Sequence, residues 1–144
     1  MRAVVIGAGA SGLMCAALLA RGGADVTVIE RNSKAGKKLF ITGKGRCNLT
    51  NDCDVSEWLA STVNGAKFLY SAAHAFPPSA VKDYFESIGL RLKTERGKRV
   101  FPCSDKSSDV IKALVRDCER GGVKFLFDKR VTAIETDGGR AVGV

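Results

Sequence analysis

Three glycines near the start of the chain have the spacing of a phosphate-binding turn. They stand in the string Gly7-Ala8-Gly9-Ala10-Ser11-Gly12, between a short apolar run and a segment with helical periodicity. In such a turn Gly7 permits a tight bend, Gly9 lets the backbone approach a diphosphate, and Gly12 lets the helix lie close to the strand. The free N–H groups at the start of the helix then face the phosphate charge. This string, named the glycine turn below, predicts dinucleotide binding.

An acidic residue stands where the ribose of such a ligand is expected. Glu30 ends the β-branched run Asp25–Glu30, 18 residues after Gly12. A carboxylate there can accept hydrogen bonds from both ribose hydroxyls of an adenosine, and it would repel a 2′-phosphate. NADP is therefore disfavoured at this site, whereas NAD and FAD share the same ADP end and both remain open. The agreement of strand, helix and Glu30 disfavours an accidental glycine-rich turn.

The elements that position these residues follow from apolar periodicity. Strands at Ala3–Ile6 and Asp25–Glu30 flank a helix at Ser11–Arg21, which makes a βαβ unit with a parallel sheet. Residues 31–53 form a glycine-rich basic loop without strand or helix periodicity beyond Leu39–Ile41. Further along we expect helices at 55–63, 66–76, 79–87 and 109–120, a hairpin within 90–101, a third core strand at 123–127, and a terminal hairpin from Val131–Glu135 and Arg140–Val144.

These elements predict an α/β fold of the Rossmann-like kind. The parallel sheet carries a long helical and loop insertion, about residues 31–122, between its second and third strands, and the chain ends in a β-hairpin. Because no linker-like segment divides the sequence, we expect one domain over residues 1–144.

Composition narrows the class of protein. With 45% hydrophobic and 26% charged residues and only 3 Pro, the 144-residue chain can bury a core. Its 23 Lys and Arg against 15 Asp and Glu give a net charge of +8, which attracts phosphates, acidic metabolites or nucleic acid. No apolar run is long enough for a membrane span, no cationic apolar leader is evident, and the five Cys show no paired spacing. We therefore expect a cytoplasmic protein without a membrane partner.

Nucleic acid and metal are disfavoured as partners. The basic residues lack interleaved aromatic platforms, and no helix-turn-helix or zinc pattern is present. We interpret the basic group on the predicted hairpin as an exposed face that protects a sheet edge; its members are Arg91, Lys93, Arg96, Lys98 and Arg99. His74 is the only histidine and has no acidic or thiol partner nearby in sequence. No metal site is expected.

Longer strings carry a family resemblance. They are Gly7 to Ala16, Gly36-Lys37-Lys38-Leu39, Ile41 to Asn51 (ITGKGRCNLTN), Arg99 to Pro102, and Ser104-Asp105-Lys106. Together they resemble the BaiN-type family of NAD(P)/FAD-dependent oxidoreductases, which are glutathione-reductase-like flavoproteins, over essentially the whole chain. The resemblance implies an FAD/NAD(P)-binding domain that forms the N-terminal part of a larger two-domain protein.

The resemblance also implies which residues bind FAD. The pyrophosphate would contact Gly7, Gly9, Ala10, Ser11 and Gly12, the adenosine Glu30 and Arg31, and Val131 would offer backbone contacts to adenine. Lys37, Lys38, Gly43, Gly45, Arg46, Cys47 and Asn48 would approach the pyrophosphate, the ribityl chain or the flavin. Lys44 or Arg46 could supply the positive charge that favours a reduced flavin. Two alternatives stay open: the basic residues belong to a solvated loop that only improves solubility, and Cys47 is favoured as a packing residue over a redox thiol.

The function expected from these residues is flavin-dependent oxidoreduction. Reduced nicotinamide, NAD(P)H, would deliver hydride to FAD, and an unidentified small organic molecule would accept it; a conjugated carbon–carbon double bond is the acceptor group that the resemblance suggests. No side chain is assigned as a catalytic acid or base, and the oligomeric state is left open. The alternative is a non-catalytic module that binds NAD or FAD.

Overall fold

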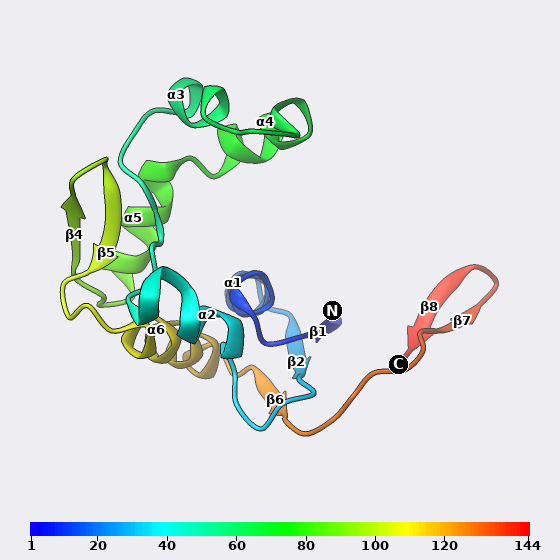
Figure 1. Cartoon of the computed structure of the whole chain (residues 1–144). Coiled ribbons are helices and arrows are strands. Elements are labelled where there is room, and N and C mark those ends of the chain that lie inside the picture. The colour runs from blue at the N-terminus through cyan, green and yellow to red at the C-terminus, as the bar shows by residue number, and fades with distance from the viewer. The chain divides into compact units, whose positions relative to one another are not determined.

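The computed structural model describes residues 1–144 and divides them into two compact units. Unit 1 comprises Met1–Lys38 and Leu114–Val144, and unit 2 comprises Leu39–Ala113. Most elements of both are labelled in Figure 1. Most of the predicted insertion therefore forms a compact unit of its own.

Unit 1 is built on a parallel sheet of three strands. Strands β1 (Arg2–Ile6), β2 (Asp25–Ile29) and β6 (Lys124–Leu126) lie in the order β1-β2-β6, with helix α1 (Ala10–Arg21) connecting the first two. Strands β7 (Glu135–Asp137) and β8 (Arg140–Gly143) pair as a separate antiparallel hairpin. The parallel sheet and the terminal hairpin confirm the predicted fold class.

Helix α1 covers one face of this sheet. Val26 and Val28 of β2 are buried together with Leu13, Ala16 and Ala17 of α1. Because successive residues of a strand point to opposite faces, Val4 and Ile6 of β1 lie on the other face, where about half of each side chain is exposed. The alternation thus separates a covered face from an open one.

Helix α6 (Ser107–Arg120) belongs to both units, and its last turns pack on α1 within unit 1. The Cys118 thiol, which is fully buried, donates to the Leu13 carbonyl at 3.3 Å. Arg21 forms an ion pair with Asp117 at 2.7 Å. These contacts tie the helix of the βαβ unit to the segment that leads into β6.

Unit 2 combines an antiparallel sheet with short helices. Strands β3 (Thr50–Asn51), β5 (Arg99–Pro102) and β4 (Leu92–Glu95) lie in the order β3-β5-β4. Helix α3 (Val55–Ala60) packs on α4 (Ala66–Ala75), and α5 (Pro78–Ser87) contacts β3 and β4. Tyr84, Phe85, Val100 and Phe101 are buried and form much of its core. The predicted hairpin within residues 90–101 corresponds to β4 and β5.

Two sequence predictions of secondary structure are wrong. Residues 31–53 contain regular elements, namely α2 (Lys37–Ile41), a 3-10 turn η1 (Thr42–Gly45) and strand β3. A helix of five residues is too short to show a periodicity, and β3 is a strand only because it pairs with β5, about fifty residues later. The predicted arm Val131–Glu135 fails because β7 begins at Glu135 and residues 131–134 pair with no strand.

Candidate functional site

The glycine turn connects β1 to α1 in unit 1. Gly7 has φ +98°, a backbone conformation that favours glycine, and its N–H continues the parallel ladder by donating to the Ile29 carbonyl at 2.8 Å. The first bond of α1 runs from the Leu13 N–H to the Gly9 carbonyl at 2.9 Å. The N–H groups of Ala10, Ser11 and Gly12 come before that bond and have no acceptor within the helix. They are the donors expected to face an anion.

The space around the three glycines differs. A Cβ atom on Gly12 would lie 1.9 Å from the Gly7 carbonyl oxygen, so the helix can approach the strand only with glycine at this position. A Cβ atom on Gly9 would meet nothing within 4 Å. The backbone at Gly9 is therefore uncovered on the side where a Cβ atom would stand.

Glu30 lies beside this turn, and its carboxylate is fixed by three hydrogen bonds. Its Oε2 accepts from the Ala8 N–H at 2.8 Å, and its Oε1 accepts from the Asn32 N–H at 2.8 Å and from Asn32 Nδ2 at 2.5 Å. Only 8% of Glu30 is exposed. Burial by itself raises the pKa of this carboxyl, but the hydrogen bonds from Ala8 and Asn32 outweigh burial, and the pKa of Glu30 lies below its ordinary value. The site holds a carboxylate at neutral pH.

The glycine turn is held from a second side as well. The Gly36 N–H donates to the Ala8 carbonyl at 2.8 Å, and Ala8 is fully buried. Both backbone groups of Ala8 are thus bonded to the segment that follows β2. The protein's own backbone and side chains therefore hold this turn.

Asn32 is a site residue that the sequence reasoning missed. Besides its two bonds to Glu30, its Oδ1 lies 3.4 Å from Lys37 Nζ. Asn often bonds to groups within two residues of itself in turns, so the spacing of Glu30 and Asn32 contains a usable indication. That spacing does not reveal, however, that the Asn32 side chain itself contacts the Glu30 carboxylate.

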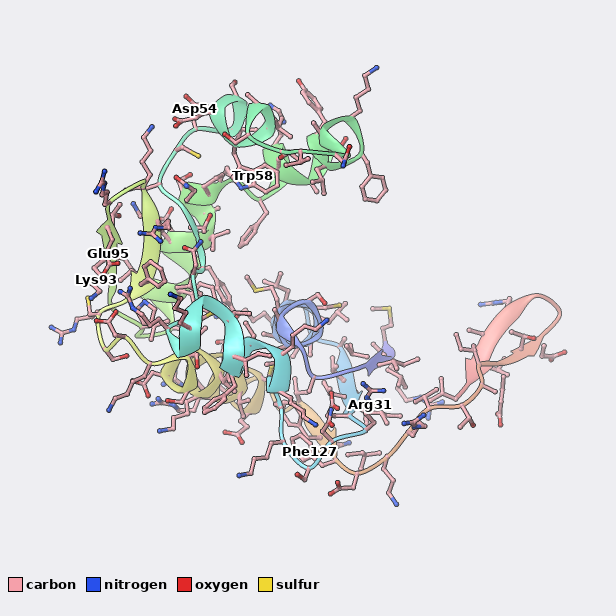
Figure 2. All side chains as sticks on the ribbon, in the orientation of Figure 1. Arg31, Asp54, Trp58, Lys93, Glu95 and Phe127 are labelled. Carbon is pink, nitrogen blue, oxygen red and sulfur yellow. The ribbon has the colours of Figure 1, made fainter.

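Of the remaining predicted residues of unit 1, Arg31, Lys37 and Lys38 are exposed. Arg31 follows Glu30 and lies at the end of β2 (Figure 2). Lys37 and Lys38 begin α2 and extend into solvent, and neither forms an ion pair. Val131 is half-buried in the segment that leads to β7. Their predicted contacts with FAD stay predictions.

In unit 2 the predicted residues lie on a turn with unusual backbone geometry. Gly43, Lys44 and Gly45 have φ values of +55°, +57° and +83° in succession, and Cys47 has φ +61°. A left-handed conformation is costly for a residue with a Cβ atom, so Lys44 and Cys47 keep it only because the surrounding structure holds it. Asn48, which is exposed, follows this turn.

Arg46 is bound within unit 2. Its Nη2 lies 2.5 Å from both Glu95 Oε1 and Asp105 Oδ1, and its guanidinium stands 4.1 Å from the centre of the Phe101 ring. Lys93 adds bonds to Asp105 at 2.6 Å and to Glu95 at 3.2 Å, its neighbour on β4 in Figure 2. The hydrogen bonds that Arg46 donates to Glu95 and Asp105 raise the pKa of its guanidinium. Lys44 and Arg46 are the two cations predicted to favour a reduced flavin. Lys44 forms no ion pair, whereas Arg46 forms one with Glu95 and one with Asp105.

Cys47 is almost completely buried, with 2% of its surface exposed. Burial raises the pKa of its thiol, and the hydrogen bond with Thr42 opposes this only in part. The thiolate needed for redox chemistry is disfavoured at neutral pH. The structure therefore supports the interpretation of Cys47 as a packing residue.

The structure brings the predicted residues together in two sets, one in each unit. The glycine turn and Glu30 contact each other in unit 1, and Gly43, Arg46 and Cys47 belong to one turn of unit 2.

No group of three or more His, Cys, Asp or Glu side chains is arranged to hold a metal ion. None of the helices has the length and apolar character needed to cross a membrane.

Comparison with curated proteins adds two kinds of relatives. The chain is 36% identical over 135 residues to a 3-dehydro-bile acid delta(4,6)-reductase of Clostridium scindens, covering 91% of this chain and 32% of that protein. It is 31% identical over 136 residues to a ribosomal RNA dihydrouridine synthase of Escherichia coli, covering 94% of this chain and 33% of that protein. The chain thus spans about a third of the length of these relatives.

Solved structures support the fold. The chain superimposes on a 3-ketosteroid-delta4-(5alpha)-dehydrogenase from Rhodococcus jostii with a TM-score of 0.74 at 19% identity, covering 96% of this chain and 40% of that one. For Thermovibrio ammonificans THI4 the TM-score is 0.60 at 12% identity, with 96% and 43% covered. A family model described as the HI0933-like protein Rossmann domain matches residues 1–144. The chain therefore belongs to the HI0933-like Rossmann domain family, in agreement with its resemblance to BaiN-type flavin-dependent oxidoreductases.

Proposed function

We propose that this chain is the FAD-binding portion of a flavin-dependent oxidoreductase. The observation that carries the proposal is the uncovered backbone at Gly9, placed at the start of α1 and beside the carboxylate of Glu30. A diphosphate at this place would meet the N–H groups of the first turn and the positive end of the helix. An adenosine ribose would meet Glu30.

FAD, when bound, supplies the hydride chemistry through its ring system. The residues of this chain bind and orient it: the glycine turn holds the diphosphate, and Glu30 holds the ribose. The reductant in this proposal is NADH or NADPH, and the acceptor is an organic molecule. Lys44 is the cation of the 42–48 turn that remains free for an anionic group.

The names of the relatives support a carbon–carbon double bond as the group that accepts hydride. One relative is a delta(4,6)-reductase, and dihydrouridine differs from uridine by reduction of one ring double bond. Both bonds are conjugated with a carbonyl group. A conjugated carbon–carbon double bond is therefore our proposed acceptor group.

A small molecule is the proposed carrier of that bond, although two relatives act on ribosomal RNA. Two cations of the basic group on the hairpin already form ion pairs within unit 2. Lys93 pairs with Asp105 at 2.6 Å, and Lys98 pairs with Glu57 at 2.6 Å. Paired cations release fewer counterions on contact with a phosphate backbone. Retention of an RNA duplex at moderate salt would contradict this part of the proposal.

The proposed location is the cytoplasm. All five cysteines are free thiols, which suits a reducing compartment. Two of them, Cys15 and Cys103, are exposed and would be open to oxidation elsewhere.

The experiment that tests FAD binding uses the purified chain and two glycine variants. Gly9 has φ −82°, so Gly9→Val fits the backbone and should fold, yet its side chain fills the proposed diphosphate position. We expect wild type to bind FAD and to bleach with dithionite, and Gly9→Val to bind FAD at least about 100-fold more weakly, a loss of some 2.7 kcal/mol. Gly22→Ala, at the other end of α1 with φ −78°, is the matched control.

The binding results decide whether the FAD site is placed correctly and whether the ligand is FAD or NAD. Equal FAD affinity of the Gly9→Val and Gly22→Ala variants would overturn the site. Tight binding of NAD without bound flavin in wild type would favour the alternative, a non-catalytic dinucleotide-binding module. Circular dichroism of all three proteins shows that a loss of binding is not a loss of fold.

A further inference from the structure

The carboxylate of Glu30 has few acceptor positions left for a ligand. A carboxylate offers about four such positions, two on each oxygen. Three are filled by the protein: the Ala8 N–H bonds to Oε2, and both the N–H and Nδ2 of Asn32 bond to Oε1. The one further position is on Oε2, the oxygen that accepts from Ala8 of the glycine turn.

Asn32 is the residue that saturates Oε1. Its amide could in principle turn its own oxygen toward Glu30, but the Lys37 ammonium, which can only donate, lies 3.4 Å from Oδ1. This contact favours the orientation in which Nδ2 faces the carboxylate. Lys37 and Glu30 thus hold the Asn32 amide between a donor and an acceptor.

We propose that Asn32 is a positioning residue that makes Glu30 recognise one hydroxyl of the adenosine ribose instead of two. The inference rests on the proposed function, since it concerns the ADP end of the same ligand. It departs from the sequence expectation that Glu30 accepts from both hydroxyls. Burial supports it, because Glu30 is only 8% exposed and its saturated Oε1 is held by the chain itself.

The test compares three ligands by calorimetric titration of the purified chain: ADP, 2′-deoxy-ADP and 3′-deoxy-ADP. In wild type, one deoxy analogue should bind within about twofold of ADP, and the other should bind at least about tenfold more weakly, because it lacks the donor for the further Oε2 position. Which of the two is weaker identifies the recognised hydroxyl.

The Asn32→Ala variant separates positioning from a merely structural role. It keeps the backbone N–H bond to Oε1 but removes Nδ2, so a second acceptor position opens. We expect both deoxy analogues to bind this variant at least about fivefold more weakly than ADP does. A variant that is only damaged would bind all three ligands more weakly by the same factor. Asn64→Ala, in the exposed turn before α4, is the control and should keep the wild-type pattern.

The outcomes distinguish this inference from the proposed function. If ADP does not bind wild type, both fail. If ADP binds and the two deoxy analogues are equally weak, or both as strong as ADP, the inference fails and the ADP site stands. An Asn32→Ala variant with the wild-type pattern also overturns the role of Asn32.

Discussion

The three glycines of the glycine turn have different physical reasons to be glycine. Gly7 needs its positive φ, Gly12 needs the absence of a side chain, and Gly9 has neither constraint in the folded chain. The fold does not require glycine at position 9, and the backbone there is open. The reason for glycine at this position would therefore be the close approach of a ligand. This is why Gly9 carries the test of function and Gly12 a test of the fold.

Gly12→Ala should destabilise the protein strongly. Its Cβ would stand 1.9 Å from the Gly7 carbonyl oxygen, which belongs to the backbone and can move only if α1 shifts from β1. We expect a loss of about 3 kcal/mol in the free energy of unfolding, at the upper end for overpacked sites. Urea titration monitored by circular dichroism measures it.

Gly22→Ala provides the comparison for that loss. Its Cβ would lie 3.3 Å from the Leu19 carbonyl oxygen, a contact that a shift of a few tenths of an ångström relieves. A Gly12→Ala variant as stable as Gly22→Ala would show that α1 does not lie as close to β1 as described.

Glu30 illustrates why a residue that is proposed to contact the ligand is not always the best one to change. Truncating it would remove the acceptor of the Ala8 N–H, and Ala8 is fully buried. A buried N–H without a partner costs about 1–3 kcal/mol, so weaker ligand binding by such a variant could come from a disturbed turn. Asn32 offers a cleaner change, because its backbone bond to Glu30 survives substitution.

At the scale of elements, α1 and the end of α6 meet at a close approach. A Cβ on Gly121, just after α6, would lie 2.8 Å from the Ala20 Cβ. Nearby, Cys118 donates to Leu13 and Asp117 pairs with Arg21. Small residues at this crossing let the two helices pack without a gap.

Gly121→Ala should therefore destabilise unit 1 by about 1–3 kcal/mol, because two methyl groups cannot share the crossing. Ala20→Gly restores the space, at a cost of about 1 kcal/mol in helix propensity. The double variant should be more stable than the sum of the two single losses predicts. Denaturant unfolding of the four proteins gives this coupling free energy, and a coupling of zero would contradict the close approach.

The sequence patterns predicted the elements that have a characteristic spacing of apolar residues within the element itself. Helices α1 and α6 show apolar spacings of three and four, and β1 and β2 are short apolar or β-branched runs. Elements that depend on distant partners were missed: β3 exists through its pairing with β5.

The same distinction applies to the candidate site. The glycine turn and Glu30 could be predicted because their spacing is local. The pairing of Arg46 could not, since its partners Glu95 and Asp105 are 49 and 59 residues away. Asn32 was missed because a sequence shows neither which way an amide points nor what faces it.

At the scale of the whole molecule, four carboxylates should make stability depend on acid. Hydrogen bonds lower the pKa of Asp52 (from Lys82 and Thr94), of Glu95 (mainly from Arg46) and of Asp105 (from Lys93 and Arg46) in unit 2. In unit 1 the bonds to Glu30 outweigh the effect of its burial. All four groups therefore hold fewer protons in the folded chain than in the unfolded one at mildly acidic pH.

A lowered pKa stabilises the fold above the unfolded-state pKa, and this stability disappears as the pH falls through the folded-state pKa. The ordinary values are 4.5 for Glu and 3.8 for Asp. We expect the contribution of these carboxylates to keep the urea midpoint nearly constant from pH 7 to 5. The midpoint should then fall steadily below about pH 4.5. Asp105→Asn should reduce that fall, whereas Asp137→Asn, at the exposed end of β7, serves as control. A midpoint that is flat down to pH 3 would contradict the expectation.

Ala8 has a consequence for how a ligand would arrive. Both of its backbone groups are bonded, to Glu30 and to Gly36, so the loop is ordered as soon as the chain folds. An incoming diphosphate then need not freeze backbone rotations, and the entropy lost on association is mainly its own. We therefore expect a diphosphate to bind in one kinetic step, with a rate set by diffusion and charge instead of by a rearrangement of the loop.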